Sequence, residues 1–558
     1  MLKTVFLGSM LWLLPLFSQA AGLALTLPQT LDWQPSPDTE QHISTVPLAN
    51  RTVPLAGQLF AGQDRQFKLL VAPDGMDNLA LDSPGKQFNH YVITNWAYID
   101  VLNWFAGSAD NTVNIPAANW VATAHRNGVK VIGSVFLAPT AWGGNASTVQ
   151  QLVQQDAQGR FPVADKLVAM AQHYGFDGWL INQETSVSAL PAAEARALSE
   201  KMQAFMQYLL SIRPDTMEIH WYDAMLSSGE VRWQNQLNSK LAEMIMPQGQ
   251  LFADAIFLNY FWRGAEPGQS QQYALTQGID PYAIYTGADL WPGRRDQAAF
   301  SNQHWLKALF DTDGSKAYTS LALFGNNFNF SFNGDQQTPA FSTFARDSSD
   351  VQSFYRAEQR LFSGDNMNKA RLAVAGEWPG LAQFMPARTV VTQLPFTTHF
   401  NTGHGQRYAR AGVLEHCDWH DIRQQDILPS WQFAVHGNPT VQLQYDFSQP
   451  YQGGSSLAIS ADLRQGTADI PLYLTGLTLA SDSSLTIVAQ QSGVAVLQLW
   501  LELDGKKQFF PLPVSEHWQQ QQFSLAEFAG RQLSRIGITL AAADQRQYQA
   551  RLGAIRVE

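Results

Sequence analysis

The sequence predicts an α/β fold class, in which a (β/α)8 TIM barrel is followed by a β-sandwich of the jelly-roll kind. Its 558 residues are too many for one ordinary domain and suggest two or three. From about residue 67 to residue 362, short apolar runs alternate with helical patterns, as they do in α/β proteins. Beyond residue 361, short alternating runs are separated by Gly, Ser and Asp clusters, which favours an all-β domain.

The amino terminus has the pattern of a signal peptide. Lys3 supplies a short basic region, Val5–Phe17 is apolar, and Ser18, Gln19 and Ala20 offer a cleavage site. We therefore expect an exported protein, periplasmic or extracellular. No later stretch reaches the roughly 18 continuous apolar residues of a spanning helix, so no membrane partner is expected. The expected domains are a signal peptide at 1–20, an extended lead-in at 21–65, the barrel at 66–370 and the β-sandwich at 371–558.

Composition excludes several classes of function. The formal net charge of −11, without basic runs, argues against nucleic acid as a partner. Cys417 is the only cysteine, so no internal disulfide can form, and we expect it to be a buried bystander. The patterns G-x-G-x-x-G, Walker A and H-E-x-x-H are absent, so no cofactor and no metal are expected. The 17 Trp, 16 Tyr and 32 Phe suit both large cores and carbohydrate binding.

The barrel half contains strand and helix patterns in alternation. Strands are expected at Tyr91–Tyr98, Lys130–Leu137, Gly178–Gln183, Glu218–Asp223, Ala255–Tyr260, Ala283–Gly287 and Ser320–Phe324. Helices are expected at Ala117–Asn127, Ala164–Tyr174, Ala192–Ile212, Gln234–Met246, Ser270–Gln277 and Gln297–Phe310. Polar or aromatic residues cap each strand, which favours a closed barrel. A doubly wound open sheet is the alternative, and the missing nucleotide motifs argue against it.

The end of the strand at Gly178–Gln183 carries the most informative pair of side chains. Asn182 and Glu184 share one face, roughly 7 Å apart along the strand. In a barrel, active-site residues lie at the carboxyl ends of strands. The other strand ends hold amides and rings with few cations, which is typical of a sugar-binding cleft. Asp223 and Asp289 also lie at strand ends, where each could bind sugar hydroxyls or cap the strand.

This pair indicates a particular way of cleaving a glycosidic bond. Two carboxyl groups normally share that chemistry, but here the neighbour of Glu184 is an amide, which cannot be a carboxylate nucleophile. Asn182 could instead orient the 2-acetamido group of an N-acetylglucosamine, whose own carbonyl oxygen attacks the anomeric carbon while Glu184 protonates the leaving oxygen. The plainer interpretation is an ordinary polar strand end.

Residues 176–184, F-D-G-W-L-I-N-Q-E, resemble the catalytic signature of glycoside hydrolase family 85, the endo-β-N-acetylglucosaminidases of N-linked glycans. Similar blocks stand at residues 91–100, 125–133, 221–224, 233–238, 257–262 and 394–403, the first two resembling the family's first two barrel strands. The resemblance covers roughly residues 65–450. It implies cleavage of the β-1,4 bond between the two core GlcNAc residues of N-glycans, on glycoproteins or free oligosaccharides, by a monomer without cofactors.

The resemblance also implies roles for the matching residues. Glu184 would be the acid and then the base, Asn182 would polarise the acetamido group, and Tyr222 would bond near it. Substrate-binding positions are expected on this basis at Trp96, Trp233, Phe261 and Trp262, and at Asp289 because it lies at a strand end. Gln183 stands where the family has a small or branched apolar residue, and its side chain should point away from the cleft.

Two other functions stay open at this point. Asp177 could begin a D-x-x-x-x-D-x-E chitinase pattern of family 18, with Asn182 in place of the second acid. On that alignment the missing aspartate argues against a chitinase, and Asp177 is better explained as a structural residue before the strand. A catalytically silent glycan-binding protein is the remaining alternative.

Overall fold

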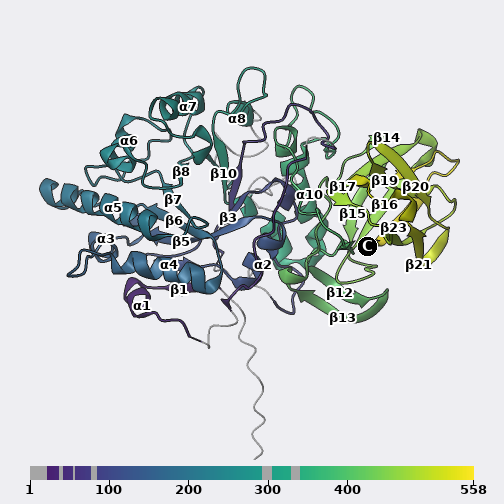
Figure 1. Ribbon diagram of the computed structural model, residues 1–558, viewed down its shortest axis with the longest axis horizontal. Coiled ribbons are helices and arrows are strands. Elements are labelled where there is room, and N and C mark those ends of the chain that lie inside the picture. The colour runs from purple at the N-terminus through teal and green to yellow at the C-terminus, as the bar shows by residue number, and fades with distance from the viewer. Residues whose placement is uncertain (1–21, 37–41, 55–56, 77–83, 292–303, 329–339) are drawn as a thin grey trace, which may run out of the picture.

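The computed structural model describes residues 22–36, 42–54, 57–76, 84–291, 304–328 and 340–558. The predicted signal peptide and the start of the predicted helix Gln297–Phe310 lie outside these residues. Figure 1 shows a barrel half in blue and teal beside a sandwich half in green and yellow, with α10 between them. None of the described helices is both long and apolar enough to cross a membrane.

Within the described residues, eight parallel strands close into a barrel, which confirms the predicted fold class. Each strand pairs with the next, and the last pairs with the first through Leu321 and Leu69. The strands are β2 (Leu69–Ala72), β3 (Val101–Asn103), β5 (Lys130–Leu137), β6 (Gly178–Gln183), β7 (Glu218–Tyr222), β8 (Ala255–Leu258), β9 (Ile284–Asp289) and β10 (Ser320–Phe324).

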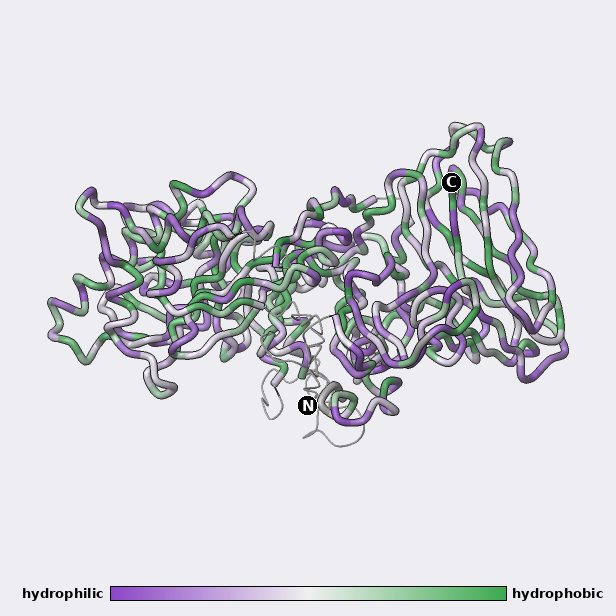
Figure 2. The backbone as a smooth tube through the Cα atoms, turned by 90° about the horizontal axis from the view of Figure 1, so that it is seen from below, coloured by the Kyte–Doolittle hydropathy of each residue, from purple (hydrophilic) through white to green (hydrophobic). Residues whose placement is uncertain are grey.

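Helices surround this barrel. The described helices that follow the lead-in are α2 (Ala118–Arg126), α3 (Ala146–Leu152), α4 (Pro162–Tyr174), α5 (Ala192–Ile212), α6 (Ser239–Ile245), α7 (Glu266–Thr276), α8 (His304–Lys307), α9 (Ala340–Arg346) and α10 (Val351–Ser363). Side chains alternate along each strand. In β6, Leu180 joins the cluster inside the barrel, whereas Trp179 and Ile181 belong to the larger core outside it. Figure 2 shows apolar segments, in green, running through the middle of this half.

The expected strand Tyr91–Tyr98 is wrong. Residues 91–95 pair with no strand, and Trp96–Tyr98 forms a 3-10 turn, η2. The apolar run misled the prediction because side chains, and no neighbouring strand, satisfy its backbone groups. Gln425 and Gln432 donate to the carbonyls of Ile93 and Thr94 at 3.0 and 2.7 Å. The first two barrel strands are instead β2 and β3, so Lys130–Leu137 is the third.

The lead-in belongs to the folded body. β1 (Leu23–Leu25) pairs antiparallel with β4 (Val113–Ile115), which in turn pairs with β5. α1 (Leu27–Asp32) follows, with Thr26 as its N-cap in a capping box. Further along, Thr52 forms a bridge with Thr389. The lead-in is therefore more ordered than the expected extended segment.

Carboxylates tie neighbouring strands together at the amino-terminal end of the barrel. Asp100, Asp177 and Asp254 each directly precede a strand and accept a backbone N–H from the strand beside it, at 2.9, 2.7 and 2.8 Å. Each also pairs with a cation-forming side chain: Arg51 and Arg388 with Asp100, His125 with Asp177, and Arg213 with Asp254. This end of a barrel serves stability, because the active site of such folds lies at the other end.

The carboxyl-terminal half forms two packed antiparallel sheets and a hairpin, as predicted for a β-sandwich. One sheet has the order β15-β16-β23-β18-β21 with β11 beside β23, and the other β14-β17-β22-β19-β20. The bounds are β11 (Phe396–Thr398), β12 (His404–Arg410), β13 (Val413–His420), β14 (His436–Gly437), β15 (Gln442–Asp446), β16 (Ser456–Ala461), β17 (Ala468–Thr478), β18 (Ser484–Gln491), β19 (Leu497–Leu503), β20 (Lys506–Pro511), β21 (Ser515–Ser524), β22 (Gln532–Leu540) and β23 (Tyr548–Val557). Cys417, on β13, is exposed, which corrects the expected buried position.

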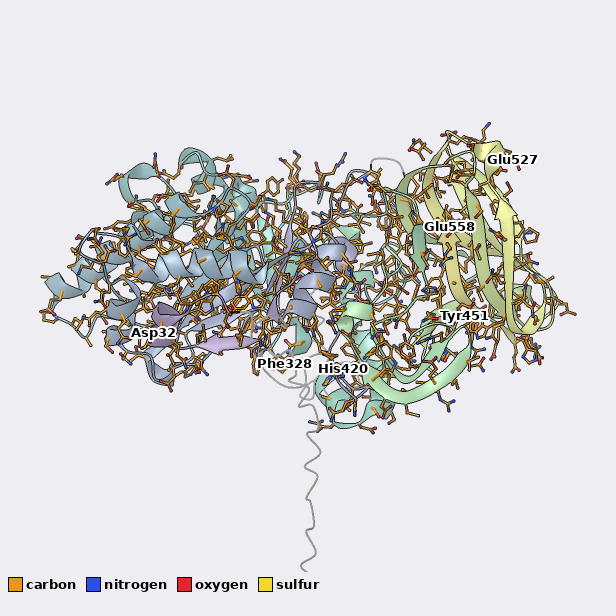
Figure 3. All side chains as sticks on the ribbon, turned by 60° about the horizontal axis from the view of Figure 1, so that its bottom comes forward. Asp32, Phe328, His420, Tyr451, Glu527 and Glu558 are labelled. Atoms are coloured by element: carbon orange, nitrogen blue, oxygen red, sulfur yellow. The ribbon has the colours of Figure 1, made fainter. Side chains whose placement is uncertain are left out.

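Buried hydrogen bonds join the two halves. Trp96 donates its indole N–H to Oε1 of Gln425 at 2.6 Å, and the Thr123 hydroxyl donates to the carbonyl of Ile422 at 2.8 Å. His420, labelled between the two halves in Figure 3, pairs through its backbone with Gly85. We call this contact region the seam.

Candidate active site

A cavity of about 790 Å³ opens at the carboxyl-terminal end of the barrel. Its described lining contains three carboxyl groups and many rings, and no Lys, Arg or His. The polar and aromatic lining includes Asp74, Trp142, Asn182, Glu184, Tyr222, Trp233, Asn259, Tyr260, Phe261, Asp289 and Trp291. A cavity of about 890 Å³ lies between α10 and the sandwich, but no carboxyl group lines it, so it offers no acid for catalysis.

Asn182 and Glu184 meet at the inner face of β6. Helix α4 ends because Gly175 takes a left-handed conformation with φ of 77° after Tyr174, and the chain then enters the strand. The amide Nδ2 of Asn182 donates to Oε1 of Glu184 at 3.0 Å. The indole of Trp233 donates to Oε2 at 3.2 Å. One carboxyl group thus receives an N–H on each oxygen.

The environment of Glu184 adapts it to proton transfer near neutral pH. Burial is the largest influence and raises the pKa of Glu184 to about 7. The N–H groups of Asn182 and Trp233 oppose that rise because they stabilise the carboxylate, while the negative charge of Asp223 adds to it. A carboxyl group with this pKa can give a proton in one step and take one back in the next.

Tyr222 lies at the end of β7 and belongs to a chain of polar contacts. Its hydroxyl donates to Oδ1 of Asn259 at 2.8 Å, and Nδ2 of Asn259 donates to Oδ1 of Asn235 at 2.7 Å. Burial raises the pKa of Tyr222 well above its ordinary value, so the phenol stays neutral and keeps its proton.

The structure brings together six of the eight residues expected at the site. Asn182, Glu184 and Tyr222 share the cavity with Trp233, Phe261 and Asp289. Trp233 and Phe261 are 41% and 49% exposed, so their rings stand at the rim. Oδ1 of Asp289 accepts the backbone N–H of Trp291 at 3.0 Å.

Trp96 and Trp262 are corrections, because neither lines the cavity. Trp96 is 2% exposed and lies in the seam, where Gln425 accepts its indole N–H. Trp262 is 4% exposed and donates its indole N–H to the carbonyl of Gly287 at 2.6 Å. Both rings are held inside the fold with their polar groups satisfied, so neither is free to contact a sugar.

Several lining residues were not among the predicted substrate-binding positions, although Trp142 and Trp291 stand in the sequence among the rings at strand ends. Trp142, in the turn η3 (Thr140–Trp142) after β5, is 71% exposed, and Trp291 follows β9. Both are visible in the sequence as rings just after strands, and that position was the available signal. Asp74 could not be found in this way, because it follows β2, a strand that the prediction missed.

The first aspartate of the chitinase pattern, Asp177, lies at the amino-terminal end of the barrel, opposite the cavity. Asp177 precedes β6, accepts the N–H of Val131 at 2.7 Å and pairs with His125 at 2.8 Å. Asp177 is therefore structural, as expected. Gln183 is also as expected, because its amide bonds to Thr185 and it does not line the cavity.

Comparison with known proteins places the chain near one family of enzymes. The model of glycosyl hydrolase family 85 matches residues 76–408, more than half of the chain. The glycoside hydrolase domain of Endo-D from Streptococcus pneumoniae R6 is similar in structure, with a TM-score of 0.80 and 25% sequence identity over 96% of this chain and 82% of that one.

Curated relatives are similar over a shorter share of their own length. A cytosolic endo-beta-N-acetylglucosaminidase of Gallus gallus is 26% identical over 80% of this chain and 53% of its own, and the Homo sapiens enzyme of the same name is 26% identical over 81% and 53%. The chain thus spans about half the length of these relatives. Their names place them in the cytosol, so the prediction of an exported protein is wrong.

Proposed function

The chain belongs to glycosyl hydrolase family 85, and on this basis we propose that it is an endo-β-N-acetylglucosaminidase. Its substrate would be the chitobiose core of N-linked glycans, cut at the β-1,4 bond between the two GlcNAc residues. The similar enzymes of Gallus gallus and Homo sapiens bear the name of this activity. The cavity supports the proposal, because its exposed rings suit the apolar faces of sugars and its end holds a carboxyl group with a pKa near 7.

The observation that carries the proposal is the pairing of Glu184 with an amide. Asn182 gives its N–H to Glu184, and its buried Oδ1 has no hydrogen-bond partner among the described residues. A buried carbonyl oxygen without a partner is costly, and a ligand N–H would satisfy it. The N–H of a 2-acetamido group is a donor of that kind, which points to N-acetylglucosamine on the donor side of the bond.

The proposed reaction retains configuration in two steps. In the first, the acetamido carbonyl oxygen attacks the anomeric carbon and forms an oxazoline, while Glu184 transfers its proton to the departing glycosidic oxygen. Oδ1 of Asn182 accepts a hydrogen bond from the acetamido N–H, which stays on nitrogen and gains positive charge as the ring closes, so the intermediate is a protonated oxazoline. In the second, the Glu184 carboxylate takes a proton from water as that water opens the oxazoline. A sugar hydroxyl in place of water would give transglycosylation.

Tyr222 would hold the acetamido group from the other side. Its neutral hydroxyl is fixed by Asn259 on the inner face of the barrel, close to where the oxazoline would form. The rim rings Trp233 and Phe261 would contact the glycan or the incoming acceptor, and Asp289 would accept bonds from sugar hydroxyls.

A digestion of defined glycopeptides tests this function. High-mannose, hybrid and complex N-glycopeptides are incubated with the purified full chain, and products are identified by mass spectrometry. We expect a peptide that keeps one GlcNAc and a glycan that ends in the other, with the β anomer released first in NMR spectra. Glu184→Gln is the control for contaminating enzymes. Failure of the folded protein to cleave any of the three classes would contradict the proposal, and binding without cleavage would favour a glycan-binding protein.

A further inference from the structure

Asp223 lies directly behind the candidate site and takes no part in the chemistry proposed above. It follows β7, is 0% exposed and does not line the cavity. Its carboxylate accepts three backbone N–H groups, from Gln234 at 3.0 Å, Asn235 at 2.7 Å and Asn259 at 3.4 Å. The donors come from two loops, those after β7 and β8.

No cation compensates this buried charge within the described residues, where only backbone N–H groups stabilise it. Burial raises the pKa of Asp223 to about 6 against the effect of those N–H groups. The carboxylates that tie strands at the amino-terminal end, such as Asp254, have a basic partner as well. A buried carboxylate without a basic partner is unfavourable for stability, so its presence calls for a role other than holding the barrel together.

The loop after β7 carries the indole N–H that is donated to Glu184. Residues 232–235 carry Trp233, whose indole N–H reaches Glu184 at 3.2 Å. Asp223 fixes this loop by accepting the next two backbone N–H groups, those of Gln234 and Asn235. The backbone next to Trp233 is thus held by the Asp223 carboxylate.

Asp223 is also linked to Tyr222, through hydrogen bonds of Asn235 and Asn259. Asn235 has a φ of 61°, a left-handed conformation that is unfavourable for residues other than glycine. In this conformation its Oδ1 accepts from Nδ2 of Asn259 at 2.7 Å and from the N–H of Phe261 at 3.1 Å. Asn259 in turn accepts the Tyr222 hydroxyl.

We propose that Asp223 is a positioning residue for the proposed reaction, because it sets both the N–H donor on Glu184 and the orientation of the Tyr222 hydroxyl. The proposal rests on the proposed function for its catalytic consequence. Its structural part, the fixing of residues 232–235 and 259–261 by one carboxylate, can be measured without any substrate.

The test replaces Asp223 with asparagine, which keeps the shape but turns an NH₂ group toward backbone N–H donors. We expect kcat on a cleavable glycopeptide to fall about 100-fold, as displacements of about 1 Å in an active site do. The matched control is Asp254→Asn, which removes a partly exposed carboxylate that accepts a backbone N–H from the neighbouring strand at the other end of the barrel. It should lower the melting temperature and leave kcat within about threefold of the parent.

A double-mutant cycle separates positioning from general loss of stability. If Asp223 acts through Trp233 and Tyr222, adding Asp223→Asn to the double variant Trp233→Phe/Tyr222→Phe should lower kcat little further. The fold losses of kcat measured separately would then not multiply in the combined variant. Fold losses that multiply, or an equal kcat loss in Asp254→Asn, would overturn the proposal. If Asp223→Asn does not fold, Asn235→Gly tests the link to Tyr222. Glycine accepts the left-handed φ but removes the amide, so kcat should fall about tenfold.

Hydrogen exchange measures the structural effect of Asp223→Asn without any substrate. In Asp223→Asn, peptides covering residues 231–236 and 259–261 should exchange faster, and the strand β6 should not. If the parent cleaves no glycan but exchange changes in this way, the proposed function fails and the positioning network stands. If the parent cleaves and neither kcat nor exchange changes, the positioning role is refuted.

Discussion

The amide of Asn182 and the carboxyl group of Glu184 are joined by a hydrogen bond of 3.0 Å from Nδ2 to Oε1. Because Oε1 of Glu184 accepts from Nδ2, the NH₂ end of the amide faces the acid and its carbonyl end faces away. The carbonyl oxygen of Asn182 is left buried without a partner among the described residues. In the proposed reaction, Glu184 would transfer the proton and Asn182 would recognise an N–H group.

Removing the amide should separate the two steps of the reaction. We expect Asn182→Ala to lower hydrolysis of natural N-glycans on the order of 100-fold, because closure of the oxazoline loses its hydrogen-bond acceptor. Turnover of a preformed sugar oxazoline should persist, since Glu184 is intact. Rates on both substrates, measured by chromatography, check this. Equal loss on the two substrates would argue against substrate assistance.

Removing the acid should abolish activity and change how stability depends on pH. Glu184→Gln should lower kcat by about 1,000-fold or more. The folded state binds the Glu184 proton more tightly than the unfolded state, with a pKa of about 7 against an ordinary 4.5. Stability from this group is thus full below pH 4.5 and is lost as pH rises through 7. The variant should be more stable than the parent at pH 8, on the order of 1–3 kcal/mol, and not at pH 4. Thermal unfolding at the two pH values measures this, and a gain at both would contradict the assigned pKa.

The pH dependence of catalysis should report the same proton. In the proposed reaction Glu184 is first an acid, so kcat/KM should decline as pH rises through about 7. Trp233→Phe removes an N–H that stabilises the carboxylate, so the pKa should increase and the decline should move to higher pH. Initial rates across a pH series for both proteins measure the shift. A shift toward lower pH would mean that Trp233 affects the profile in some other way.

Two tryptophans should behave in opposite ways. Trp142 is exposed at the cavity, so Trp142→Ala should raise KM about tenfold and barely change stability. Trp96 lies in the seam, so Trp96→Phe should cost about 1–3 kcal/mol by leaving Gln425 Oε1 unpaired, with KM unchanged. Steady-state kinetics and denaturant unfolding of the two variants test this assignment. A raised KM in Trp96→Phe would return that residue to the binding site.

The sequence predicts the elements with strong periodicity and the residues tied to them. The bounds of α5, β5, β6 and β10 agree with the prediction because long apolar patterns end in clear polar positions. β2 and β3 escaped the prediction, since strands of four and three residues carry little alternation. Residues 91–95 misled it because an apolar run can be buried without forming a strand.

The site residues, too, could be predicted where strand periodicity places them and could not where distant contacts do. Asn182 and Glu184 could be identified because β6 alternates, so their common face follows from position alone. Trp96 and Trp262 could not be separated from Trp233, because a ring beside a strand can point into the fold or out of it. The partner of each indole N–H decides the outcome, and those partners, Gln425 and the carbonyl of Gly287, are distant in sequence.

The seam has a consequence for how the protein loses its structure. The carbonyls of Ile93 and Thr94 in the barrel half find their donors on Gln425 and Gln432, beyond the barrel strands. A barrel produced alone would lose both donors and expose the buried side chains of the seam to water, which would destabilise it. The two halves should therefore melt together in a single calorimetric transition, and a cut near residue 370 should yield two fragments that fold poorly apart.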